Sequence, residues 1–330
     1  MIRYRRTKFR RSNRSRPCPI CKGDGCGQAD GLVLCWRVES DERARSDAWI
    51  HRFEQPTGKG RLFTVYPPPL IAPIDRRHLV YNGLLQSLTL KSIHAGHLRT
   101  DRRLSNETIA EEGFASVPGR KQAAAIVPGL AALHDLTHVP GFYRLPGQPW
   151  AMRFAGIEGF FIPLRDVRGR IAGLQIRRWP ENDDKKRYLL LSTDPQDEDE
   201  QGASCFPHGA RSDAPMHFAK PHKCADGVII TEGALKANVA AELCDLCVVG
   251  LVAAGTFSPR VGWELRDALP RLRRVRIAYD ADKRTNETVA RQLKRLKRAL
   301  EEAGIDQSEW TWQAKLGNGL DDYLINSTLL

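Results

Sequence analysis

Two short apolar runs in the last third of the sequence constrain its fold, because each ends directly before an acidic residue. Residues 227–231 are rich in β-branched side chains and precede Glu232, and residues 275–279 precede Asp280. Such runs are typical of buried strands, and helical patterns follow both. Strands that alternate with helices predict an α/β domain with a parallel sheet, in which the carboxyl ends of the strands line one crevice. We therefore expect Glu232 and Asp280 to lie close together.

Further carboxylates follow the same order along the chain. Asp282 comes two residues after Asp280, and Asp321 and Asp322 follow a glycine near the C-terminus. Carboxylates gathered in one crevice repel one another unless a cation lies among them. Oxygen ligands suit Mg²⁺, and catalysis at phosphate by one or two such ions is the natural use of such a site. Any one of these acids alone would more simply cap a helix or lie in a solvated turn.

Taken together, the three acidic motifs resemble a TOPRIM domain, the metal-binding fold of bacterial-type (DnaG-like) primases, topoisomerases and some nucleases. The motifs are Glu232-Gly233, Asp280-Ala281-Asp282 and Gly319-Leu320-Asp321-Asp322. The resemblance implies that Glu232, Asp280 and Asp282 are catalytic and hold Mg²⁺ or Mn²⁺. It also implies that Asp321 or Asp322 completes the cluster, directly or through water. Lys236, four residues after Glu232, would then face the same crevice and bind phosphate, or it is a solvated helix lysine.

Four cysteines near the N-terminus have the spacing of a metal site. Cys18, Cys21, Cys26 and Cys35 are separated by two, four and eight residues. A Cys-x-x-Cys turn with a glycine-rich return is typical of a structural Cys₄ zinc site, in which no catalysis takes place. His51 could replace one ligand. A disulfide framework would instead fit an extracellular chain.

The other four cysteines give a weaker signal. They are Cys205, Cys224, Cys244 and Cys247. The spacing of Cys244 and Cys247 suits metal or redox chemistry, but the pair lies between an expected helix and an expected strand. We interpret these cysteines as buried and unpaired.

The charge of the chain is concentrated at its N-terminus. The net charge is +12, and residues 1–16 contain eight basic residues and no acid, which leaves +4 for the rest. Such an arm is attracted to polyanions through counterion release, although it could also be a solubilising tail. No apolar stretch is long enough to span a bilayer and no signal peptide precedes the arm, so we expect a cytoplasmic, nucleoid-associated protein.

The middle of the chain carries a hairpin pattern over residues 159–178. This hairpin and the segment 186–192 resemble elements upstream of the TOPRIM domain in bacterial-type primases. The resemblance implies that template and incoming nucleotide are bound by Arg170, Arg177, Arg187 and Tyr188, whereas the simpler interpretation is an exposed hairpin with solvated arginines. Two features depart from the family pattern: Asn318 takes the place of a common lysine, and Gln175 and Ile176 replace paired glycines.

These patterns predict five segments. They are a basic arm (1–16), a zinc ribbon or knuckle (17–53), a Pro- and Gly-rich linker (54–75), the N-terminal subdomain of a primase core with mixed α+β structure (76–222) and a TOPRIM domain (223–330). We also expect a helix over residues 105–113, capped by Ser105 and closed by Gly113.

The function implied by the resemblance is that of a DNA primase. Such an enzyme makes short RNA primers from nucleoside triphosphates on a single-stranded DNA template by two-metal-ion nucleotidyl transfer, here for a phage, plasmid or other mobile element. The sequence has no G-x-x-x-x-G-K-[ST] motif, so a separate replicative helicase is expected. The alternatives are a TOPRIM nuclease and a non-catalytic zinc/TOPRIM protein that binds nucleic acid.

Overall fold

The computed structural model describes residues 10–13, 17–29, 32–40, 42–44, 48–52, 70–179, 187–253, 255–258, 260–281 and 287–327. Most of the expected basic arm, and residues 54–69 of the expected linker, lie outside this part of the chain. The chain divides into two compact units, Met1–Pro68 and Pro69–Leu330. No helix in the described ranges is long and apolar enough to cross a membrane.

The first unit is a small antiparallel sheet. Its described strands are β1 (Arg10–Arg11), β2 (Gly27–Ala29), β3 (Leu32–Cys35), β4 (Glu42–Arg43) and β5 (Trp49–Arg52), in the order β1-β2-β3-β5-β4. Its buried apolar cluster consists of Val33 and three of the four N-terminal cysteines. So small a core stabilises a fold only weakly, and units of this size commonly depend on a metal or disulfides.

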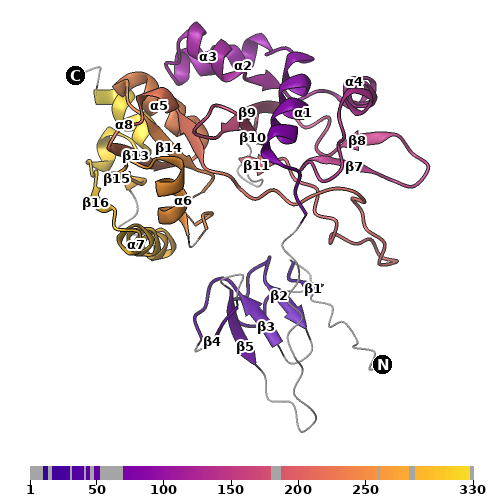
Figure 1. The fold of residues 1–330 in the computed structure, drawn as a ribbon, viewed down its shortest axis with the longest axis horizontal. Coiled ribbons are helices and arrows are strands. Elements are labelled where there is room, and N and C mark those ends of the chain that lie inside the picture. The colour runs from indigo at the N-terminus through magenta and orange to yellow at the C-terminus, as the bar shows by residue number, and fades with distance from the viewer. Residues whose placement is uncertain are drawn as a thin grey trace. The chain divides into compact units, whose positions relative to one another are not determined.

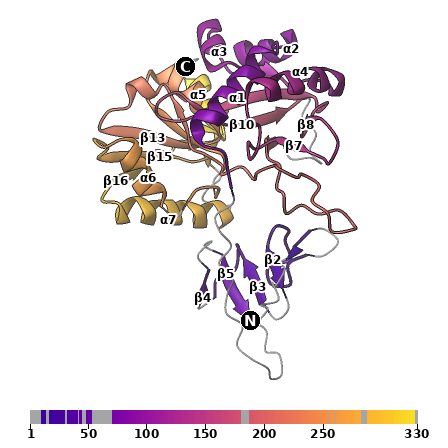
Figure 2. The same cartoon turned by 45° about the vertical axis from the view of Figure 1, so that its right-hand side comes forward.

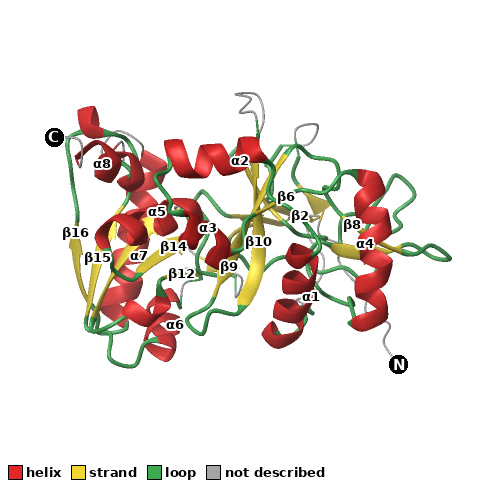
Figure 3. Ribbon diagram, turned by 90° about the horizontal axis from the view of Figure 1, so that it is seen from above, coloured by secondary structure: helices red, strands yellow, loops and turns green. Residues whose placement is uncertain are grey.

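The N-terminal half of the second unit surrounds a hairpin. Its elements are α1 (Ile74–Gln86), α2 (Ser92–Gly96), the π-helical turn η1 (His97–Asp101), α3 (Asn106–Glu112), β6 (Ala115–Ser116), α4 (Arg120–Leu133), β7 (Phe142–Arg144), β8 (Trp150–Met152), β9 (Gly159–Arg165), β10 (Ile171–Arg178) and β11 (Tyr188–Leu190). The expected hairpin is confirmed, since β9 and β10 pair antiparallel in the sheet β11-β10-β9-β6. Helix α1 packs against β10 and α4 packs against β8, and their buried apolar residues share one cluster with the sheet (Figure 3).

The C-terminal half is a mostly parallel sheet between two helical layers. Its elements are β12 (His217–Ala219), the 3₁₀ turn η2 (Pro221–Lys223), β13 (Gly227–Glu232), α5 (Ala234–Cys244), β14 (Val248–Leu251), α6 (Val261–Ala268), β15 (Arg274–Ala278), α7 (Glu287–Glu302), β16 (Asp306–Glu309), the 3₁₀ turn η4 (Ala314–Leu316) and α8 (Leu320–Ser327). The described strands run in the order β12-β14-β13-β15-β16, and only the edge strand β12 is antiparallel to its neighbour.

Alternate residues of the central strands β13, β14 and β15 face the two helical layers. Helices α5 and α8 cover one face of the sheet, and α6 and α7 cover the other (Figures 1 and 2). In α7 the apolar stripe that contains Leu293, Leu296 and Leu300 is buried, whereas Arg291, Lys294 and Arg298 are exposed. The expected α/β architecture is therefore confirmed, and it places the ends of β13 and β15 at one edge of the sheet.

The two halves of the second unit share a core. Leu98 and Phe160 from the N-terminal half pack with Leu235 and Val239 of α5. The expected helix before this core is confirmed as α3: the Ser105 hydroxyl accepts a hydrogen bond from the Thr108 backbone, and Gly113 closes the helix with φ 73°. The strand β12, which precedes the expected boundary at 222/223, belongs to the C-terminal sheet.

A buried imidazole also connects the halves. His217 of β12 accepts a hydrogen bond at Nδ1 from the backbone N–H of Arg165 (3.0 Å) and donates from Nε2 to Asn238 Oδ1 of α5 (2.7 Å). These two partners fix the neutral Nε2–H tautomer, because a protonated ring would bring two N–H groups together at Nδ1.

One interpretation of the cysteines is wrong. Cys224 and Cys247 form a disulfide with their Cα atoms 4.8 Å apart, and Cys205 and Cys244 are free but only partly buried. Cys224 follows η2, between β12 and β13 in the chain, and Cys247 directly precedes β14. In the sheet, β14 lies between β12 and β13, so the two cysteines come close together. This proximity follows from the strand order, so spacing along the sequence does not reveal it.

The buried His217 gives stability a pH dependence. Burial lowers its pKa, together with the Arg165 charge and against the opposing effect of the Glu112 carboxylate and Asn238. Below pH ~6.5 the unfolded chain therefore binds a proton that the folded chain excludes, and the free energy of unfolding falls by up to about 1.4 kcal/mol per pH unit. Urea denaturation of the wild type and of His217→Gln from pH 8 to pH 5 measures this. The free energy of unfolding should fall less steeply with decreasing pH in the variant than in the wild type. Equal slopes would contradict this role.

Candidate metal centres and neighbouring basic groups

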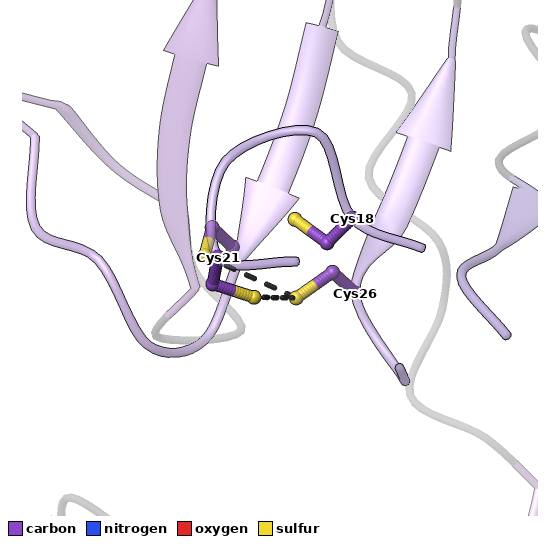
Figure 4. Close-up of side chains that lie close together, drawn as sticks. Cys18, Cys21 and Cys26 are labelled. Atoms are coloured by element: carbon purple, nitrogen blue, oxygen red, sulfur yellow. Dashed lines mark hydrogen bonds between the residues drawn. The ribbon is translucent and has the colours of Figure 1, made fainter. Parts of the chain in front are cut away.

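The four N-terminal cysteines meet in one cluster. Their sulfur atoms all lie within 4.8 Å of one another, with Cys21 and Cys26 3.6 Å apart (Figure 4) and Cys26 and Cys35 3.9 Å apart. A tetrahedral zinc ion with Zn–S bonds of ~2.3 Å holds its sulfurs about 3.8 Å apart. The cluster thus fits a structural zinc ion. His51 instead contacts the backbone carbonyl of Val38 at 3.0 Å.

The protein surrounds these sulfurs with donors. The backbone N–H groups of Arg37 and Val38 point at Cys35 Sγ (3.5 and 3.4 Å), and the Arg37 guanidinium contacts Cys21 Sγ at 3.4 Å. Burial raises the pKa of the Cys26 thiol to about 12. Burial acts upward on Cys21 too, but hydrogen bonds from Gly23 and Arg37 outweigh it and lower the pKa of Cys21 to about 6. Zinc takes thiolates, so its binding would release a proton from a buried thiol such as Cys26.

The second candidate centre lies at the carboxyl edge of the parallel sheet. Glu232 is the last residue of β13, and Asp280 follows β15, which pairs with β13 in parallel. The backbone N–H of Asp280 lies 3.4 Å from Glu232 Oε1. The third acidic motif joins them because the backbone N–H of Ala281 donates to the carbonyl of Asn318 at 2.8 Å.

Lys236 lies among these acids. From the first turns of α5 its Nζ donates to Asp280 Oδ1 at 2.5 Å, and the amide of Asn318 lies 3.4 Å from Asp280 Oδ2. Burial lowers the pKa of Lys236, but the charges of Asp280, Asp321 and Glu232 outweigh burial and raise it above its ordinary value. Lys236 is therefore a charged partner of the acidic cluster and not a solvated helix lysine.

Arg102 provides a second cation from the other half of the unit. It follows η1 and donates from Nη1 to Asp321 Oδ2 at 2.6 Å and to Asp322 Oδ1 at 3.3 Å. Asp321 is 1% exposed, and burial raises its pKa against the opposing charge of Arg102. Its Oδ1 is buried and has no hydrogen-bond partner in the described ranges.

The donor set suits a divalent cation, since it offers hard oxygens and one buried carboxylate oxygen without a partner. Within the part of the chain that the structure describes, however, the cysteines are the only group of three or more ligands close enough to share one ion. Lys236 and Arg102 occupy positions among the carboxylates. Asp282 lies outside the described residues.

The residues expected to bind template and nucleotide lie apart. Arg170 precedes β10, and its guanidinium bonds Asp75 (2.7 Å) and Asp166 (2.7 Å). Arg177, near the other end of β10, is 1% exposed and donates to the Tyr188 hydroxyl at 2.5 Å. Arg187 is exposed.

The end of β10 that carries Arg177 lies near His97, on which Arg102, the partner of Asp321, also acts. Arg177 and Arg102 both act electrostatically on the imidazole of His97, and burial, the larger effect, lowers the pKa of that histidine. The His97 ring lies 4.5 Å from that of Trp179. Of the four residues, Arg177 and Tyr188 therefore form a pair on the His97 side of the sheet, whereas Arg170 lies at the far end of the strand.

Sequence reasoning missed Arg102 and His97. The run 99–103 contains three arginines, and this local charge is the only signal that could have marked it. Arg102 meets its partner across 219 positions of the chain, a pairing that no spacing rule predicts.

Comparison with known proteins supports the fold. Residues 223–329 match a family described as a domain of unknown function, DUF3854. No curated protein matches the sequence.

Several solved structures are similar at low sequence identity. The zinc-binding and RNA polymerase domains of the Aquifex aeolicus primase are 16% identical with a TM-score of 0.57, and the match covers 78% of this chain and 60% of that one. A DnaG primase catalytic domain bound to single-stranded DNA is 18% identical with a TM-score of 0.54, covering 77% and 75%. The RNA polymerase domain of Mycobacterium tuberculosis DnaG is 12% identical with a TM-score of 0.53, covering 77% and 81%. The chain thus has the fold of a DnaG primase catalytic core and spans 60% of the length of the Aquifex structure.

Zinc should hold the first unit together. We expect the purified protein to contain about one equivalent of zinc, and Cys35→Ser to lose most of it because a four-thiolate site binds poorly with three. Metal analysis by mass spectrometry measures this, with Cys205→Ser as a control that alters a free cysteine outside the cluster. Equal zinc content in the Cys35 variant and the wild type would contradict the assignment.

The pair formed by Arg102 and Asp321 should stabilise the second unit. Arg102→Met leaves the buried carboxylate uncompensated, so the free energy of unfolding should fall by about 3 kcal/mol. Adding Asp321→Asn should restore most of this loss, because the buried charge is then removed. Urea denaturation tests both, with Arg103→Met, an exposed neighbour, expected to change stability by less than about 0.5 kcal/mol. If Arg102→Met were as stable as Arg103→Met, the contact between Arg102 and Asp321 would not stabilise the unit.

Proposed function

We propose that this chain is a DNA primase that synthesises short RNA primers on single-stranded DNA. The observation that carries the proposal is the meeting of Glu232 and Asp280 at the carboxyl edge of a parallel sheet, in a chain with the fold of a DnaG catalytic core. The similar structures are too distant in sequence to transfer an activity. The proposal therefore rests on the local chemistry of the site.

Glu232, Asp280 and Asp282 would provide the oxygen ligands for Mg²⁺ or Mn²⁺. When bound, two such ions lower the pKa of an attacking 3′-hydroxyl and stabilise the charge on the leaving pyrophosphate. The protein itself would hold the reactants in place. Asp321 and Asp322, bonded to Arg102, keep the acidic edge attached to the N-terminal half.

Residues of the β10–β11 region would bind nucleic acid and nucleotide. The Arg177–Tyr188 pair presents an aromatic ring whose hydroxyl is fixed by a guanidinium, and such rings commonly stack on bases. Arg187 is exposed and would contact phosphate. Arg170 is a poorer candidate, because two carboxylates already compensate its charge.

The first unit would contribute to template binding. Arg10 and Arg11 are exposed on β1, and Trp36 is 45% exposed beside the zinc cluster. Arginines and an exposed aromatic side chain are the groups that bind single strands. We further propose that a separate helicase supplies the template and that the primers serve a phage, plasmid or other mobile element.

The test is primer synthesis from labelled nucleoside triphosphates on random single-stranded templates with Mg²⁺ or Mn²⁺. Glu232→Gln and Asp280→Asn should each reduce product at least about 100-fold, because each removes an anionic ligand. Asp226→Asn is the matched control: Asp226 lies at the opposite end of β13, where it pairs with Arg274 at 3.0 Å, and this variant should keep full activity. Metal-dependent cleavage of DNA without incorporation would favour the nuclease, and the absence of both activities would favour the non-catalytic binding protein.

A further inference from the structure

The position of Lys236 raises a chemical problem for metal binding. Its ammonium group donates to Asp280 Oδ1, the same carboxylate that the proposed function assigns to a divalent cation. The side chains of Lys236 and Asp280 are 24% and 18% exposed, so little water screens the pair. An ammonium group and a divalent cation cannot both lie against one carboxylate oxygen, because like charges at such distances repel strongly. A divalent cation that takes Asp280 Oδ1 must therefore displace Lys236.

A second acceptor is available nearby. Asp321 is 1% exposed, and while its Oδ2 accepts from Arg102, its Oδ1 is buried without a hydrogen-bond partner in the described ranges. A buried carboxylate oxygen without a hydrogen bond lowers the stability of the fold, and native structures seldom retain one without a functional reason. An oxygen of this kind is suited to receive a donor that arrives from elsewhere in the site.

The local backbone leaves room between the two groups. Lys236 Nζ and Asp321 Oδ1 both border the space beside Gly319, where a Cβ would lie only 3.0 Å from the ammonium nitrogen. Because Gly319 has no side chain, nothing from this residue separates the lysine from the buried oxygen. The lysine stem has four flexible carbons, so a short movement of the ammonium group is accessible.

We propose that Lys236 has two positions and acts as a positioning residue for the metal. Without metal its ammonium group holds Asp280 in place; when a divalent cation binds Glu232 and Asp280, Lys236 releases Asp280 and donates to Asp321 Oδ1. Lys236 thus stays paired with a carboxylate in both states, and the divalent cation offsets the negative charge that Lys236 and Arg102 leave. This inference rests on the metal site of the proposed function but not on primer synthesis.

The proposal also assigns different roles to the acids. Asp280 exchanges an ammonium group for a metal ion, whereas Asp321 receives the displaced ammonium group and is not itself a ligand. If Asp321 instead bound the metal directly, the loss of its charge would weaken binding whether or not Lys236 was present. The two assignments can therefore be separated by a double-mutant cycle.

The experiment is titration of the full chain with Mn²⁺, followed calorimetrically and by the electron paramagnetic resonance signal of free Mn²⁺. Lys236→Met removes the competing cation and should tighten Mn²⁺ binding about 10-fold. Asp321→Asn should weaken binding about 10-fold in the wild type but no more than about 2-fold in the Lys236→Met background. Lys315→Met removes the same charge from an exposed residue near the third acidic motif and should leave the affinity unchanged.

Two results would overturn the proposal: unchanged or weaker Mn²⁺ binding by Lys236→Met, or an equal effect of Asp321→Asn in both backgrounds. Lys236→Gln provides a second test should the methionine variant fail to fold. Since these measurements need no template or nucleotide, an inactive protein that shows the predicted cycle would refute the proposed function while leaving the role of Lys236 intact.

Discussion

Electrostatic repulsion among carboxylates is the constraint on which the second unit depends. The parallel sheet delivers Glu232 and Asp280 to one edge, and α8 adds Asp321 and Asp322. Carboxylates delivered to one edge repel one another unless cations lie among them. The protein supplies two of its own: Lys236 on the helix after β13, and Arg102 from the N-terminal half. The acidic edge is thus partly neutralised before any metal binds.

One of these cations, together with two other groups of contacts, also joins the two halves of the unit. Arg102 connects η1 to α8, His217 connects β9 to α5, and an apolar cluster that includes Phe160 and Leu235 lies between the halves. The candidate site therefore belongs to neither half alone. A change at the joint should alter both stability and the geometry of the acids, because one side chain, Arg102, serves both.

The parts of the fold with strong local patterns were predictable. The β-branched runs, the Ser105 cap and the spacing of the N-terminal cysteines each depend on neighbours within a few residues, and each predicts its element. Contacts that depend on tertiary packing could not be predicted from the sequence. The Cys224–Cys247 disulfide, the Arg102–Asp321 pair and the burial of Arg177 all depend on which distant segments meet. The sequence predicts only part of the role of Lys236. Its position four residues after Glu232 indicates that it faces the crevice, but not that it bonds to Asp280.

The most direct test is anomalous diffraction from crystals of the full chain soaked in Mn²⁺. We predict an anomalous peak within coordinating distance of both Glu232 and Asp280, with the Lys236 ammonium group displaced from Asp280 toward Asp321. A peak bound by Asp321 and Asp322 with Lys236 still bonded to Asp280, or no peak at this edge of the sheet, would contradict it.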